Sequence, residues 1–68
     1  MGMTGNMAQW LSDLLDPAIS DAEGAARNEH LWAVGAEDQE AATMHEKNSE
    51  ELKQYAELLR EIRKDYVD

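Results

Sequence analysis

The sequence contains no cysteine, no phenylalanine and only one proline. Without cysteine the chain can form neither a disulfide nor a thiolate nucleophile. This composition fits a reducing compartment, and we expect a cytoplasmic protein. Valine, isoleucine and threonine together number six, too few for the β-branched strands of a sheet. The abundant residues are strong helix formers, so the composition predicts an all-α protein.

Basic residues are also scarce, because the chain has 6 lysines and arginines against 15 acids and a net charge of −9. Between residues 13 and 46 nine acids accompany a single base, Arg27, whereas the remainder of the chain is nearly balanced. A strong negative charge opposes contact with phosphates and with anionic membranes. It favours partners with basic surfaces. We therefore predict a protein partner with a basic surface, no direct nucleic acid and no membrane.

Long apolar runs are absent as well, since none approaches the roughly 18 residues of a membrane span. The opening residues, MGMTGN, lack the basic and apolar regions of a signal peptide. We expect residues 1–6 to be a flexible N-terminus and residues 7–68 to be a single helical domain. A chain of 68 residues folds marginally on its own. Regular helix packing, homo-oligomerisation or a partner is the usual remedy.

The first apolar pattern is helical. Met7, Trp10, Leu11, Leu14 and Leu15 follow the spacing i, i+3, i+4, i+7, i+8, which is typical of one helix face. This spacing predicts a short helix over about 7–15 with Trp10 in the core. Asp16 and Pro17 then suit the cap and first turn of a new helix.

A second helix is expected over about 17–47, with a possible break at Gly35, because glycine costs about 1 kcal/mol relative to alanine in a helix. Its large apolar residues are few, and alanines fill much of one face. Asn48 and Ser49 can cap a third helix, with Glu51 completing a box-like arrangement.

The third helix is predicted over about 50–66, with large residues at alternating spacings of three and four. These residues form a heptad seam, which we expect to serve as the core or oligomer seam: Leu52, Tyr55, Leu59, Ile62 and Tyr66. The fold class is therefore all-α. A short N-terminal helix precedes an antiparallel helical hairpin, which forms a helical bundle by homo-oligomerisation.

Neither histidine has the environment of a helical metal site. Such sites use Glu-x-x-His, but Arg27 and Ala42 stand three residues before His30 and His45. Glu23, His30 and Glu37 share one helical line, about 10 Å apart, which would require several copies to hold an ion. The serines have no histidine at helical contact spacing. We expect no catalytic residues, no cofactor and no metal site, and hence no enzyme.

Recognition features are concentrated around the centre of the chain. Leu31 and Trp32 could anchor a partner, and three acids follow within eight residues: Glu37, Asp38 and Glu40. These five residues are the candidates for partner binding. The predicted function is a small acidic protein–protein interaction module, as a regulator, inhibitor or accessory subunit. The alternatives are a nucleic-acid mimic that inhibits a DNA- or RNA-binding protein and, second, a metal-binding ferritin-like oligomer. Such a chain would suit a phage accessory protein.

Overall fold

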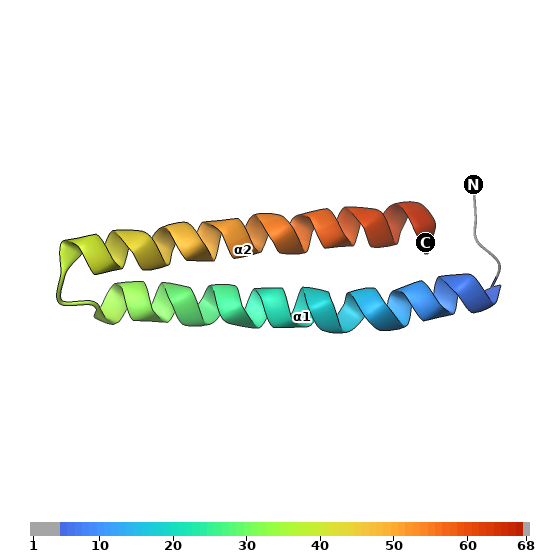
Figure 1. Cartoon of the computed structure of the whole chain (residues 1–68), viewed down its shortest axis with the longest axis horizontal. Coiled ribbons are helices and arrows are strands. Elements are labelled where there is room, and N and C mark those ends of the chain that lie inside the picture. Colours follow the sequence, from blue (N-terminus) through green and yellow to red (C-terminus); the bar gives the residue numbers. More distant parts are fainter. Residues whose placement is uncertain (1–4, 68) are drawn as a thin grey trace.

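A computed structural model of the chain describes residues 5–67. Two helices, α1 (Gly5–Gly35) and α2 (Gln39–Tyr66), account for almost all of them. The helices lie side by side in opposite directions and are joined by a short loop at one end (Figure 1). We call the loop end the closed end and the other the open end. The described part is thus all-helical, as predicted, and takes the form of an antiparallel hairpin.

The loop between the helices begins where the sequence places a break. α1 ends at Gly35, the position at which the sequence indicated a possible break. Asp38 then caps α2, because its backbone is extended and its carboxylate accepts a hydrogen bond from the amide of Glu40 at 3.2 Å. The cap satisfies one of the amides that every helix start leaves without an internal partner.

The predicted boundary at Asp16 and Pro17 is wrong, because α1 continues through both residues. Asp16 does not cap a helix. Its carboxylate instead accepts hydrogen bonds from the Ser12 hydroxyl at 3.1 Å and from Arg63 at 2.8 Å. Proline removes a backbone donor inside a helix. Burial of residues on both sides of it, against the second helix, offsets that cost. A separate short helix over 7–15 is therefore not found.

The predicted boundary at Asn48 and Ser49 is wrong for a related reason. Ser49 lies in the middle of α2 and is the most deeply buried side chain, 1% exposed. Its hydroxyl donates to the carbonyl oxygen of Ala26 at 2.8 Å, which satisfies the polar group across the helix contact. The N-terminal expectation also changes, because Gly5 and Asn6 are helical. Residues 1–4 of that segment lie outside the described residues.

The helices meet along a seam of mostly small residues. On α1 the buried positions recur at spacings of three, four or seven: Ser12, Leu15, Ile19, Ala22, Ala26 and Ala33. On α2 they are Ser49, Ala56 and Leu59. Small side chains let two helices approach closely, but they bury little apolar area. Among residues 5–67, large buried side chains form one cluster, made by Leu15, Ile19 and Leu59.

The seam of α2 is rotated relative to the predicted one. Leu59 is buried and Ile62 packs against the core cluster, whereas Tyr55 and Tyr66 are each 50% exposed. Leu52 is partly buried. The expectation that Trp10 belongs to the core is wrong for the hairpin, since Trp10 is 68% exposed. That the five predicted residues form an oligomer seam stays a prediction.

Candidate interaction surface

All five candidate partner-binding residues lie at the closed end of the hairpin. Leu31 and Trp32 are in the last turns of α1, Glu37 and Asp38 are in the loop, and Glu40 is in the first turn of α2. Each of them is exposed. We call these five residues the tip surface. The fold therefore places an apolar pair and three carboxylates at the loop end of the hairpin.

Trp32 is exposed yet held in place. It is 59% exposed, and its ring meets the imidazole of His45 edge-on, with 5.6 Å between centroids and 65° between planes. Nδ1 of His45 lies 2.5 Å from a carboxylate oxygen of Glu29, and this pair is partly buried. Glu29 thus holds His45, and His45 in turn contacts the indole of Trp32, which remains exposed.

A second histidine–glutamate pair crosses the hairpin beside the first. Nδ1 of His30 lies 2.7 Å from a carboxylate oxygen of Glu46, in an exposed position. The two pairs join the helices within a few turns of the loop. These hydrogen bonds between side chains join the two helices at the closed end. The buried seam there consists of small residues.

Sequence analysis missed both pairs, because it considered only neighbours along a single helix. The signal was present in the mirrored dipeptides, Glu29-His30 before the loop and His45-Glu46 after it. A hairpin that turns at residues 36–38 places these dipeptides opposite one another. Recognising them requires the position of the turn, which the sequence indicated only as a possible break at Gly35.

The acids of the tip surface have different roles. Asp38 caps α2 through its carboxylate, so its function is at least partly structural. Glu37 and Glu40 are exposed on either side of it. Carboxylates close to the start of a helix interact favourably with its dipole.

Two acids nearer the open end, Asp16 and Glu23, are engaged within the hairpin. Arg63 binds Asp16, and Arg60 binds Glu23 across the helices. The hydrogen bond from Arg63, helped by that from Ser12, holds the pKa of Asp16 below its ordinary value of 3.8. Arg60 and Arg63 of α2 are thus paired with acids of α1, whereas the tip surface carries three acids and no base.

An open groove beside the loop adds apolar surface to the closed end. It lies between His30 and Glu46 and is lined by Ala33, Val34 and Ala42. Val34 is exposed there. The groove is on the side of the hairpin that carries the exposed histidine–glutamate pair.

Metal-ligating and nucleophilic groups do not converge in residues 5–67. No group of three histidine, aspartate or glutamate side chains is positioned to hold an ion in that part of the chain. The hydroxyls of Ser12 and Ser49 donate to Asp16 and to the carbonyl of Ala26. These polar groups therefore serve the helix contact in the structure.

Comparisons with protein-family models, with curated proteins and with solved structures found no match for this chain. Neither α1 nor α2, over the residues described, is long and apolar enough to cross a bilayer.

Proposed function

We propose that the chain is a small protein–protein interaction module that docks a partner through the tip surface. The observation that supports this most directly is Trp32, which is exposed but oriented by His45. A side chain that is already fixed loses less conformational freedom on binding. Tryptophan is also among the residues that most often dominate the energy of an interface.

The partner is expected to offer an apolar pocket with a basic rim. Leu31 and Trp32 would enter the pocket, while Glu37 and Glu40 would face lysine or arginine side chains. Complementary charges of this kind raise the association rate and fix the orientation of docking. The module would act by occupying or bridging surfaces, as a regulator, inhibitor or accessory subunit, rather than by catalysing a reaction.

Nucleic-acid mimicry remains the alternative, and the distribution of charge makes it the weaker one. A mimic presents an uninterrupted series of carboxylates to a site built for phosphates. On α2 the acids are interspersed with Lys47, Lys53 and Lys64. A metal-binding oligomer ranks lower still, because ligands from more than one copy would have to meet.

The test begins with affinity capture, in which the tagged chain is used to isolate its partner from a lysate of the source organism. Binding is then measured with the purified partner. Replacing Trp32 by alanine should weaken binding about 30-fold, which corresponds to about 2 kcal/mol for an interface hot spot. The double substitution Glu37→Gln and Glu40→Gln should slow association and reduce its dependence on salt.

Two matched variants control for general effects of removing an aromatic ring or two charges. Tyr66→Ala removes an exposed aromatic side chain at the other end of the hairpin. Glu57→Gln with Glu61→Gln neutralises two exposed acids away from the tip. Equal losses for Trp32→Ala and Tyr66→Ala would exclude the tip surface as the docking site. Competition by DNA or RNA for the partner would instead support mimicry.

A further inference from the structure

A second apolar surface lies at the open end of the hairpin, far along the rod from the tip surface. Trp10 and Leu14 are one helical turn apart on α1 and both are exposed. Tyr55 and Leu58 are half exposed on α2. Two partly buried neighbours connect these side chains to the core. We call the set the Trp10 patch; it comprises Trp10, Leu11, Leu14, Tyr55, Leu58 and Ile62.

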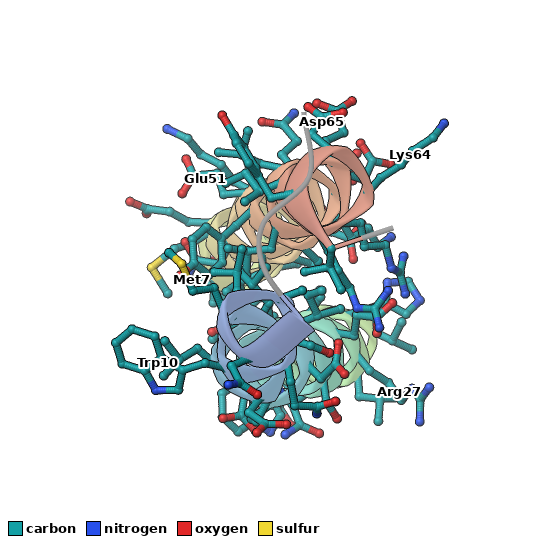
Figure 2. The ribbon with its side chains drawn as sticks, turned by 90° about the vertical axis from the view of Figure 1, so that its right-hand side faces the viewer. Met7, Trp10, Arg27, Glu51, Lys64 and Asp65 are labelled. Atoms are coloured by element: carbon teal, nitrogen blue, oxygen red, sulfur yellow. The ribbon has the colours of Figure 1, made fainter. Side chains whose placement is uncertain are left out.

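The members of the patch share one side of the hairpin. Leu11 and Ile62 pack against the same core cluster, and residues three or four apart on a helix lie on the same face. Leu14 therefore accompanies Leu11, and Leu58 accompanies Ile62. In the view along the rod from the open end, Trp10 projects away from the ribbons on the side opposite Arg27 and Lys64 (Figure 2).

The Trp10 patch is the outer surface of an incomplete core. Three large side chains, Leu15, Ile19 and Leu59, form the only buried cluster of that kind among the described residues. The rest of the seam is made of alanine and serine. A chain of this size rarely gains enough stability from so small a core. A further layer packed on the patch would enclose the cluster from its open side.

The exposed area of the chain agrees with a missing layer. The chain exposes 5230 Å², whereas about 4300 Å² is expected for a compact monomer of 7.7 kDa. The excess, about 900 Å², is close to the roughly 800 Å² that each partner contributes to a standard interface. The radius of gyration is likewise large, 15.5 Å against about 11 Å for a compact chain of this length.

We propose that the Trp10 patch is covered by the same patch of a second copy, so that two hairpins form a symmetric four-helix dimer at their open ends. A second copy carries the same patch, so it can supply the missing layer without any other molecule. A two-fold contact places one surface against itself, which is the commonest arrangement among soluble oligomers. The tip surfaces lie at the far ends of this dimer and stay accessible.

Charge gives the dimer a distinctive dependence on salt. Each copy carries a net charge of −9, so repulsion opposes the pairing of two copies. Added salt screens this repulsion and should strengthen the dimer. The complex between the tip surface and a basic partner should respond in the opposite direction. The dimer contact and the partner contact can therefore be distinguished by measuring both at a series of salt concentrations. If one of the two contacts is not found, the proposal for the other still stands.

The experiment is sedimentation equilibrium of the whole chain from low to high micromolar concentration, with fluorescence of Trp10 in the Trp32→Phe background. We expect a monomer–dimer equilibrium, together with a blue shift and weaker acrylamide quenching of Trp10 as the dimer forms. Leu14→Lys, in the patch, should weaken the dimer at least 30-fold. Ser20→Lys, an equal change of charge at an exposed position of α1 outside the patch, should leave it unchanged.

Unfolding measurements keep the proposal testable if Leu14→Lys loses its helical structure. The midpoint of thermal unfolding of the unaltered chain should rise with protein concentration, because dimerisation stabilises the folded state by mass action. A folded monomer at all concentrations, with Trp10 fully open to acrylamide, would overturn the proposal. So would a dimer that Leu14→Lys and Ser20→Lys weaken equally.

Discussion

The indole ring of Trp32 lies edge-on to the imidazole of His45, with 5.6 Å between the ring centroids. The contact joins the last turns of α1 to α2, and Glu29 holds the imidazole from the other helix. An exposed aromatic side chain thereby acquires a defined orientation. This relationship underlies the proposal that the closed end of the hairpin is a docking site.

Replacing His45 by alanine should therefore weaken docking, although His45 itself is not one of the residues proposed to contact the partner. We expect the affinity for the partner to fall about threefold to tenfold, because Trp32 must then be ordered on binding, at a cost of about 1 kcal/mol. Faster motion of Trp32 in fluorescence anisotropy, measured in a Trp10→Phe background, would accompany the loss. Arg60→Ala is the matched control, since it also removes a pair that crosses the helices but lies away from the tip surface and the groove. Equal effects of the two substitutions would contradict the account of Trp32.

Pro17→Ala should stabilise the hairpin. Proline inside a continuous helix removes a backbone hydrogen bond at a cost of about 3 kcal/mol, of which less than 1 kcal/mol is returned by restricting the unfolded chain. We expect the free energy of unfolding to rise by about 2 kcal/mol in urea titrations. If Pro17 instead began a separate helix, alanine would be neutral or destabilising there, because proline is favoured in a first turn.

The small residues of the seam should tolerate little added volume. Ala26 is 2% exposed and its carbonyl accepts the hydrogen bond from Ser49. Ala26→Leu should destabilise the hairpin by about 1–3 kcal/mol, because it forces the helices apart and disrupts that bond. Leucine is a good helix former, so Ser20→Leu on the exposed side serves as the control for helix propensity. A stable Ala26→Leu variant would show that the helices do not approach closely at this position.

Stability should fall in acid as Asp16 is protonated. The pKa of Asp16 is lower in the folded chain than its ordinary value of 3.8, chiefly because Arg63 donates a hydrogen bond to its carboxylate. A lowered carboxyl pKa contributes stability that is present above the ordinary value and is lost as the pH falls through the folded value. The difference in unfolding free energy between the unaltered chain and Asp16→Asn should therefore shrink below about pH 4. A difference that is constant from neutral pH down to pH 2 would exclude this contribution.

The helical content and the turn were accessible from the sequence, because they depend on local rules. Composition predicted helices, and Gly35 marked the end of α1. The Asp16-Pro17 boundary followed an equally sound local rule and was wrong. The contact of Arg63 with Asp16 and the burial of Leu15 and Ile19 against the second helix depend on tertiary packing, which outweighs a capping preference.

The sequence indicated five candidate residues, whose role in binding stays a prediction, but it did not indicate how the fold arranges them. Leu31 and Trp32 were identified from residue type, and their meeting with the acids at the closed end followed once the turn was known. The contact between Trp32 and His45 depends on the register of the two helices. Along a seam of alanine and serine, neighbouring registers look alike in the sequence, so periodicity alone does not select one of them.

The measurement that tests the central claim most directly is a map of amide chemical-shift changes in the isotope-labelled chain on titration with the captured partner. The account predicts that the largest changes occur in residues 29–46, which include the tip surface and the histidine–glutamate pairs. Changes concentrated in residues 8–18 and 55–62 would place docking on the Trp10 patch and contradict the assignment of Trp32 as the anchor.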